Sequence, residues 1–273
     1  MRTLVHLSDL HFDHIDEAII APLTTVIGNA KPDLVVVSGD LTQRARTGQF
    51  KAARLFLDGL PKPQIVVPGN HDIPLHNVVS RFFRPLEKYR RYITNDLAPF
   101  HVDEEIAVLG INTARSLTIK NGRINAVQME HIRERLCALD DSVTRIIVTH
   151  HPFDLPRSFG DRDLVGRASI AMKIFAGCRI DFFLAGHLHA SHAGSMSERY
   201  KIADYGAIAV QAGTTTSTRG RGESNSFNIL RIAPGRVTID RMSWMPSSST
   251  FDCVSTETFE LTSKGWASVK SEI

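Results

Sequence analysis

Short runs of apolar, β-prone residues recur along the first two thirds of the chain, and each run ends in a polar cluster. The runs cover residues 4–7, 34–37, 65–67, 106–109, 146–148 and 182–184. Apolar runs of this length, bounded by turn-forming residues, are typical of buried strands.

Between these runs lie stretches with helical spacing of apolar residues, at residues 16–29, 49–57, 78–89 and 126–139. The last of them has a start signal, because Asn125 can cap it and Gln128 stands three residues later. Aromatic residues among arginines in the segment 78–92 favour an amphipathic helix packed on the core over a cap helix or a lipid-facing element. The alternation of strands and helices predicts a sheet whose faces are covered by helices.

The final third changes character after residue 207. Short β-like runs at 208–211, 227–232 and 237–242 are separated by turns rich in Gly and Ser. We expect these runs to form antiparallel strands that complete a second sheet. The predicted fold is therefore a single α/β domain over residues 1–273, a four-layer sandwich of two mixed β-sheets flanked by helices.

Composition narrows the class of protein. The 273 residues are 42% hydrophobic, enough for a packed core. Lys and Arg number 32 against 29 Asp and Glu, so no global basic field indicates a nucleic-acid partner. No window approaches the roughly 18 uninterrupted apolar residues of a membrane span, and residues 1–5 run into a strand pattern without a secretory signal.

The chain has three cysteines, Cys137, Cys178 and Cys253, which are widely spaced and form no C-x-x-C pair. This spacing supports neither a disulfide framework nor a zinc site with thiolate ligands. We therefore expect a reducing compartment, the cytoplasm.

Side chains that bind metals follow the apolar runs directly. The polar clusters are Ser8-Asp9-Leu10-His11, Ser38-Gly39-Asp40, Pro68-Gly69-Asn70-His71-Asp72, Thr149-His150-His151-Pro152 and Ala185-Gly186-His187-Leu188-His189. Side chains just beyond the carboxyl ends of neighbouring strands converge on one crevice of an α/β sheet. An Asp or Gly alone is a common turn residue. Five such clusters, each after a predicted strand, indicate one site.

Seven potential ligands stand in these clusters: Asp9, His11, Asp40, Asn70, His150, His187 and His189. Carboxylates, an amide oxygen and imidazoles coordinate Mn, Fe, Zn or Co without any thiolate. Seven ligands are too many for one ion, and they suit two ions roughly 3.5 to 4 Å apart that clamp a displacement at phosphorus. The predicted cofactors are two divalent transition-metal ions.

These five motifs, in this order, resemble the calcineurin-like metallophosphoesterase superfamily, in particular its cyclic-nucleotide and glycerophosphodiester phosphodiesterase branch. The motifs span residues 9–189, about two thirds of the chain. The resemblance implies that Asp9, His11 and His189 bind one metal and that Asp40 bridges both. The second metal would be held by Asn70, His150 and His187.

The resemblance also implies roles for neighbouring residues. His71 would contact the phosphoryl oxygen or protonate the leaving group, and Asp72 would support it by orienting its ring. The choice of His150 over its neighbour His151 as ligand rests on its being the first of the two after the strand. His151 would then support His150 or face the substrate. Two further residues are candidate substrate contacts, Asn112 and Arg221, for which the alternatives are a turn and a solvated loop arginine.

The activity that the resemblance implies is hydrolysis of a phosphodiester by a metal-bound hydroxide. The substrate would be a small-molecule or lipid-derived diester: a cyclic nucleotide, a glycerophosphodiester or a phospholipid. A phosphomonoesterase or a nuclease of the same superfamily is the alternative, and homo-oligomerisation stays open. A non-enzymatic scaffold with this fold is disfavoured because the ligand set has no gap.

Overall fold

The computed structural model describes residues 1–75, 77–118, 120–156, 159–218 and 222–269. Its first sheet has the strand order β13-β12-β11-β10-β1-β2-β3. Three strands from the first part of the chain run parallel: β1 (Arg2–Leu7), β2 (Leu34–Val37) and β3 (Gln64–Val66). The others are antiparallel neighbours from the end of the chain: β10 (Ser226–Ala233), β11 (Arg236–Met245), β12 (Thr250–Thr262) and β13 (Gly265–Val269).

The second sheet has the order β4-β5-β6-β7-β9-β8. Its central strands run parallel: β5 (Ile106–Gly110), β6 (Thr144–Val148), β7 (Phe182–Ala185) and β9 (Ile208–Gln211). The edge strands are antiparallel to their neighbours: β4 (Phe100–Val102) and β8 (His192–Ser195).

The expectation that the last third completes a second sheet is wrong for most of its strands. β9 does join the second sheet, but it pairs in parallel with β7. β10 pairs with β1, so β10 to β13 extend the first sheet. Alternating apolar residues indicate a strand but carry no information about which sheet edge the strand will pair with.

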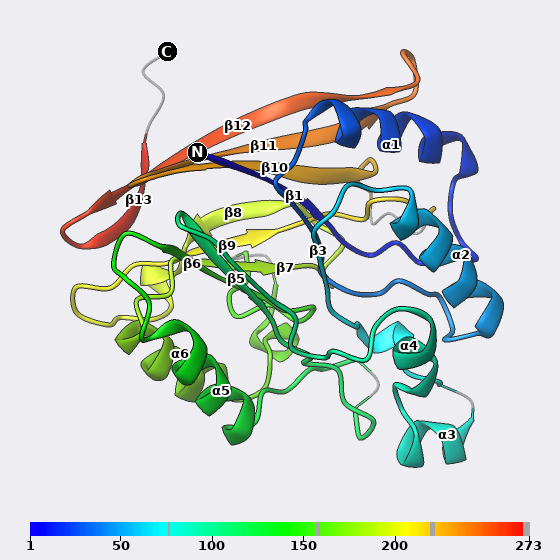
Figure 1. Ribbon diagram of the computed structural model, residues 1–273, viewed down its shortest axis with the longest axis horizontal. Coiled ribbons are helices and arrows are strands. Elements are labelled where there is room, and N and C mark those ends of the chain that lie inside the picture. Colours follow the sequence, from blue (N-terminus) through cyan, green and yellow to red (C-terminus); the bar gives the residue numbers. More distant parts are fainter. Residues whose placement is uncertain (76, 119, 157–158, 219–221, 270–273) are drawn as a thin grey trace.

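The two sheets pack face to face with helices on their outer faces, which confirms the predicted α/β sandwich (Figure 1). A core of branched apolar residues from both sheets, including Leu4, Val36, Val108 and Leu184, lies between them. A second core joins the first sheet to α1 (Ile20–Asn29), α2 (Thr47–Asp58) and α4 (Glu87–Tyr92). A third joins the other sheet to α5 (Ala126–Leu136) and α6 (Ala168–Gly177). Short 3-10 turns are η1 (Glu17–Ile19), η2 (Asn70–Asp72), η3 (Asp161–Asp163) and η4 (Met196–Glu198).

The capping signal before α5 is confirmed. The side-chain oxygen of Asn125 accepts the N–H of Gln128 at 2.9 Å, and the Gln128 side chain accepts the N–H of Asn125 at 3.1 Å. The pair satisfies amide groups that a helix start leaves without partners.

The helix expected over residues 78–89 is wrong as one element, because the chain forms two short helices there, α3 (Val78–Phe83) and α4. Pro85 lies between them, and proline disfavours helical conformation in the residue before it. α4 packs on the core, with Tyr89 fully buried and its hydroxyl donating to the carbonyl of Val66 at 2.9 Å. α3 does not, since its four large apolar side chains are exposed.

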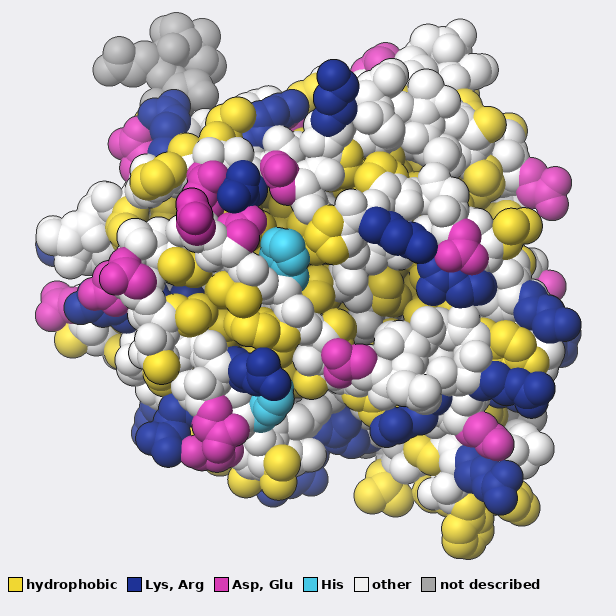
Figure 2. All heavy atoms as spheres, in the orientation of Figure 1, with side chains coloured by type: hydrophobic (Ala, Val, Ile, Leu, Met, Phe, Trp, Pro, Cys, Tyr) yellow, Lys and Arg dark blue, Asp and Glu magenta, His cyan; other side chains and the backbone are white. Residues whose placement is uncertain are grey.

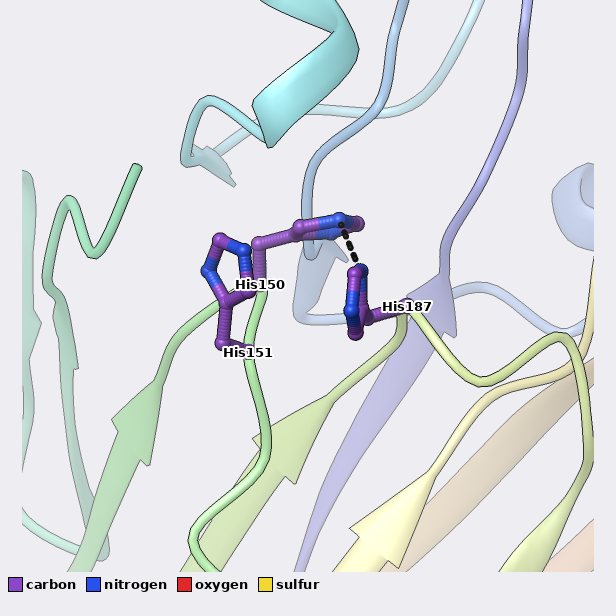
Figure 3. Close-up of side chains that lie close together, drawn as sticks. All are labelled: His150, His151 and His187. Atoms are coloured by element: carbon purple, nitrogen blue, oxygen red, sulfur yellow. Dashed lines mark hydrogen bonds between the residues drawn. The ribbon is translucent and has the colours of Figure 1, made fainter. Parts of the chain in front are cut away.

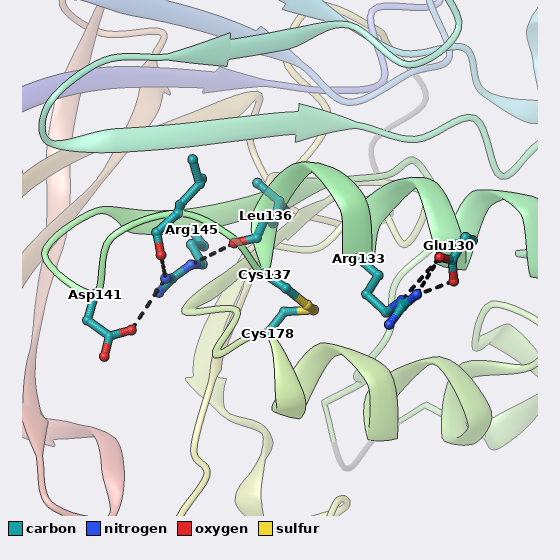
Figure 4. The surroundings of a disulfide bond; sticks show 8 residues. Glu130, Arg133, Leu136, Cys137, Asp141, Arg145 and Cys178 are labelled. Carbon is teal, nitrogen blue, oxygen red and sulfur yellow. Dashed lines mark hydrogen bonds and ion pairs between the residues drawn. A yellow bond between two sulfur atoms is a disulfide. The ribbon is translucent and has the colours of Figure 1, made fainter.

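The expectation of no disulfide is also wrong, because Cys137 and Cys178 are bonded (Figure 4). Cys137 follows the last residue of α5 and Cys178 follows the last residue of α6. The two helices pack side by side on one sheet face, which brings together cysteines that are 41 residues apart. Sequence spacing alone does not show this packing, so the argument for a reducing compartment loses its basis.

Among the described residues, no helix has both the length and the apolar character needed to cross a membrane.

Candidate metal centre

The predicted ligands lie at the carboxyl ends of strands from both sheets. Asp9 and Asp40 follow β1 and β2, and Asn70 opens the turn η2 after β3. His150 follows β6, while His187 and His189 follow β7. Because β1, β2 and β3 are parallel, as are β6 and β7, the side chains gather where the two sheets meet.

Five of the seven predicted ligands have left-handed backbone conformations. These are Asp9, His11, Asp40, His187 and His189, with φ between 48° and 72°. Residues other than glycine rarely adopt this region, and such strain concentrates at functional sites. The backbone thus leaves each strand sharply and turns successive side chains into one space.

Glycines allow the close approach of these turns. Gly39 has φ of 96°, and a Cβ there would lie 2.7 Å from Nδ1 of His150. A Cβ on Gly186 would lie 1.7 Å from Oγ of Ser8. Neither position can hold a larger residue without displacing a side chain of the centre.

The first group of predicted ligands consists of Asp9, His11 and His189. Oδ1 of Asp9 lies 3.5 Å from Nε2 of His11 and 3.6 Å from Nε2 of His189. The other oxygen of Asp9 accepts from the hydroxyl of Ser8 at 2.6 Å and from the N–H of His187 at 3.0 Å. Asp9 therefore directs Oδ1 toward the two rings, and Oδ1 of Asp9 and Nε2 of His11 are buried without a hydrogen-bond partner among the described residues.

The second group of predicted ligands consists of Asp40, Asn70, His150 and His187 (Figure 3 shows two of them). Nε2 of His150 lies 3.2 Å from Oδ1 of Asn70, 3.4 Å from Oδ2 of Asp40 and 3.3 Å from Nδ1 of His187. Nδ1 of His150 donates to the carbonyl of Ser38 at 2.8 Å, so the neutral ring carries a lone pair on Nε2.

Asp40 connects the two groups. Its Oδ1 accepts from the N–H of His71 at 2.8 Å, while its Oδ2 lies 3.4 Å from His150 Nε2 and 3.8 Å from His11 Nε2. One carboxylate oxygen is thus fixed by the backbone and the other faces both ligand groups.

The titration behaviour reflects this crowding of polar groups in a buried place. Burial lowers the pKa of His150, but the negative charges of Asp40 and Asp9 outweigh the effect of burial. The pKa of His150 is therefore raised to about 9. Burial and then the charge of His150 lower the pKa of His187 to about 3. Lone pairs of carboxylates, an amide and imidazoles converge here, and a cation relieves their mutual repulsion. The residues present fit divalent metal ions.

His71 lies at the edge of both groups and is partly exposed. Its Nδ1 lies 2.9 Å from the carbonyl oxygen of Gln43, so the neutral ring donates there and carries its lone pair on Nε2. Its ring stands edge-on to that of His11, with centroids 4.9 Å apart.

Asp72 does not orient the ring of His71, contrary to expectation. Its carboxylate accepts from the N–H groups of Gly69, Leu41 and Thr42 and from the hydroxyl of Thr42, at 2.9 to 3.2 Å. Asp72 instead ties the turn after β3 to the turn after β2. Burial and the charge of Asp40 raise its pKa.

His151 is held by bonds at both ring nitrogens. Nε2 donates to the carbonyl of Lys120 at 2.9 Å, and Nδ1 accepts from the hydroxyl of Thr113 at 2.8 Å. Burial is the main cause that lowers its pKa well below the usual value. The geometry favours His150 over His151 as the ligand, since of these two rings it is His150 that places a nitrogen 3.4 Å from Asp40.

Asn112 and Arg221 are the two remaining candidate substrate contacts. Oδ1 of Asn112 accepts from the N–H of Ala114 at 2.9 Å, which is a turn contact, and Asn112 also lines a cavity of about 700 Å³ with Ile73 and Arg115. Arg221 lies outside the described residues.

Several residues of the centre were not identified from the sequence. Ser38 and Gln43 act through backbone carbonyls, which any residue type carries. Thr214 places its hydroxyl 2.6 Å from Nδ1 of His189, and the hydroxyl of Thr215 accepts from the N–H of Ser8 at 3.0 Å. In the sequence, both residues stand in the threonine run that follows Gly213.

Comparison with protein families matches residues 2–191 to the calcineurin-like phosphoesterases. The chain is 35% identical over 80 residues to the glycerophosphodiester phosphodiesterase GpdQ of Enterobacter lignolyticus, covering 25% of this chain and 29% of that protein. It is 21% identical over 212 residues to the 3',5'-cyclic adenosine monophosphate phosphodiesterase CpdA of Escherichia coli, covering 76% and 70%. A probable cyclic nucleotide phosphodiesterase of Synechococcus is 26% identical over 165 residues, covering 55% and 58%. The match thus spans less than two thirds of the length of the Enterobacter and Synechococcus proteins.

Two solved structures share the fold. A purple acid phosphatase from yellow lupin seeds superposes with a TM-score of 0.72 at 12% identity, covering 94% of this chain and 53% of that one. A dimetal phosphatase from Danio rerio superposes with a TM-score of 0.67 at 14% identity, covering 96% and 99%. At these identities the likeness shows the fold alone.

Proposed function

Because this chain belongs to the calcineurin-like phosphoesterase family, we propose that it hydrolyses a phosphodiester at a centre of two divalent metal ions. The observation that carries the proposal is the convergence of lone-pair atoms on two neighbouring groups that share Asp40. Asp9, His11 and His189 would hold one ion. Asn70, His150 and His187 would hold the other.

The ligand set restricts the metals. It contains carboxylate and amide oxygens and imidazole nitrogens, and none of its seven members is a cysteine. Such a set suits Mn, Fe, Zn or Co. When bound, two such ions would lower the pKa of a water molecule and offset negative charge on a phosphoryl group.

We assign proton transfer to His71. Its Nδ1 is fixed on the carbonyl of Gln43, so the proton that it gains or loses sits on Nε2. A protonated His71 would donate that proton to the oxygen of the leaving group, which otherwise departs as an alkoxide. Asp40 would support His71 indirectly by accepting its backbone N–H.

The diester class of substrate is supported by the names of the curated relatives, two of which are cyclic nucleotide phosphodiesterases and one a glycerophosphodiester phosphodiesterase. Monoester hydrolysis and nuclease activity are the alternatives within the family. A scaffold without activity is disfavoured, because the side chains of all seven predicted ligands lie near one another among the described residues.

The remaining parts of the proposal concern the whole protein. We propose that residues 1–273 form one domain, because the core between the two sheets and the outer core of the first sheet both combine strands from the two ends of the chain. We also propose a cytoplasmic location, where the Cys137–Cys178 pair would be kept reduced. Thiol trapping in cell fractions tests it.

Turnover of bis(p-nitrophenyl) phosphate and of p-nitrophenyl phosphate, each with added manganese, tests the proposed activity. We expect the diester to be hydrolysed with the higher kcat/KM. No turnover of either by the metal-loaded protein would contradict an enzymatic role, and preference for the monoester would favour a phosphatase. A panel of cyclic AMP, glycerophosphocholine and phosphatidylcholine then identifies the class of diester.

A further inference from the structure

Helix α3 carries its charged side chain inward and its apolar side chains outward. Arg81 is only 6% exposed, and its guanidinium donates to the carbonyls of Ser116, Pro74 and Thr118 at 2.5 to 3.2 Å. The exposed side chains are Val78, Val79, Phe82 and Phe83. A surface helix of a globular protein normally has the opposite arrangement, with its apolar face on the core. The three bonds of Arg81 fix this inversion, since a buried guanidinium needs its partners.

A neighbouring loop adds a fifth apolar side chain. Leu117 stands between Ser116 and Thr118, the two residues whose carbonyls bind Arg81, and it is 85% exposed. The loop is therefore held against α3. We call Val78, Val79, Phe82, Phe83 and Leu117 the apolar tip.

Basic side chains stand next to the apolar tip. Arg84, Arg90 and Arg91 follow α3 and are exposed. In residues 84–96 the acidic side chains are those of Glu87 and Asp96, and Glu87 pairs with Arg84 at 3.5 Å. Figure 2 shows hydrophobic side chains projecting at the lower right edge of the molecule, over α3, with Lys and Arg side chains beside them.

We propose that the apolar tip and these arginines dock the protein on the surface of a bilayer that contains anionic lipid. A projecting apolar element with flanking cations suits the headgroup region, where apolar side chains enter the acyl boundary and cations meet anionic phosphates. This inference is independent of the proposed function.

Charge argues against the same surface binding a second copy of the chain. A two-fold dimer brings the same patch of both subunits together. The patch with Arg84, Arg90 and Arg91 would then face the same patch of the other copy, and like charges across an interface are unfavourable. An anionic membrane surface has the complementary charge instead.

Flotation with vesicles tests the docking. The full chain is mixed with vesicles of phosphatidylcholine alone, or of phosphatidylcholine and phosphatidylglycerol in equal parts. We expect binding to the anionic vesicles, weakened by salt. The double variant Phe82→Ser with Phe83→Ser should bind at least about tenfold more weakly. The charge variant Arg90→Glu with Arg91→Glu should bind the anionic vesicles more weakly than the native protein, and its remaining binding should depend less on salt.

A matched control replaces exposed apolar residues elsewhere, Val127→Ser on α5 with Ile170→Ser on α6. It should bind vesicles as the native protein does, and circular dichroism should show native folding in every variant. Absence of native binding to anionic vesicles at low salt would overturn the proposal, as would equal loss in the control. Sedimentation velocity adds a third measurement, the oligomeric state. If the native protein is a dimer and the Phe82→Ser, Phe83→Ser variant is a monomer, the apolar tip is a protein interface and the docking proposal is overturned.

Discussion

The imidazole of His150 donates from Nδ1 to the carbonyl oxygen of Ser38 over 2.8 Å, and this bond turns Nε2 toward the carboxylate of Asp40. A backbone carbonyl accepts only, so the bond selects the tautomer that a metal ligand needs. The neighbouring His151 has the reverse arrangement, with its Nε2 proton bound by Lys120.

His150→Ala should therefore lose one metal ion and nearly all turnover. His151→Ala should keep its metal content but unfold more easily, by about 1 to 3 kcal/mol, because the Lys120 carbonyl loses its ring donor and the Thr113 hydroxyl loses its ring acceptor. Metal analysis and urea unfolding of both variants measure the difference. Loss of metal from the His151 variant alone would reverse our assignment.

His71→Ala should lower kcat by roughly 100- to 10,000-fold while both metals stay bound, as expected when a general acid is lost. The loss should be smaller for a substrate with a good leaving group, such as p-nitrophenolate, than for one that leaves as an alkoxide. Steady-state kinetics with both kinds of diester check this. An equal loss with both would remove the proton-donor role.

The disulfide lies at the ends of α5 and α6 that are remote from the metal ligands, since β6 begins at Thr144 near Cys137 and ends before His150. Cys137→Ser should lower the free energy of unfolding by about 4 kcal/mol, from the entropy of a 41-residue loop. Turnover should not change. Urea unfolding with and without reductant measures the effect, and Cys253→Ser, at an exposed free cysteine, is the control.

Asp181 gives a pH signature away from the metals. Burial raises its pKa to about 6, against the bonds that it accepts from Trp266 and Arg145. The folded state thus binds this proton more tightly than the unfolded state, so the contribution is full below about pH 4 and is lost as pH rises through 6. The variant Asp181→Asn does not titrate, so its stability does not fall over this pH range for this reason. The melting temperature of the variant relative to the native protein should rise from pH 4 to pH 7, and a constant difference would contradict the pKa shift.

The sequence predicted the strands and the ligand motifs because both depend on residue types in local order. Asp9, Asp40 and His187 each follow an apolar run, and parallel strands bring such ends together. Contacts through backbone carbonyls, as at Ser38 and Gln43, leave no trace in residue type. The inversion of α3 was hidden because apolar spacing shows that a helix has an apolar face but not whether that face packs on the core. The Cys137–Cys178 bond depends on helix packing between distant segments.

Metal content tests the two-ion centre most directly. Native protein loaded with manganese and dialysed should contain two ions per chain by mass spectrometry of its metals, and Asp40→Ala should contain at most one and lack turnover. Asp252→Ala, at an exposed aspartate on β12, is the matched control and should keep both ions. Two ions and native turnover in the Asp40 variant, or native protein that binds no metal, would contradict the account.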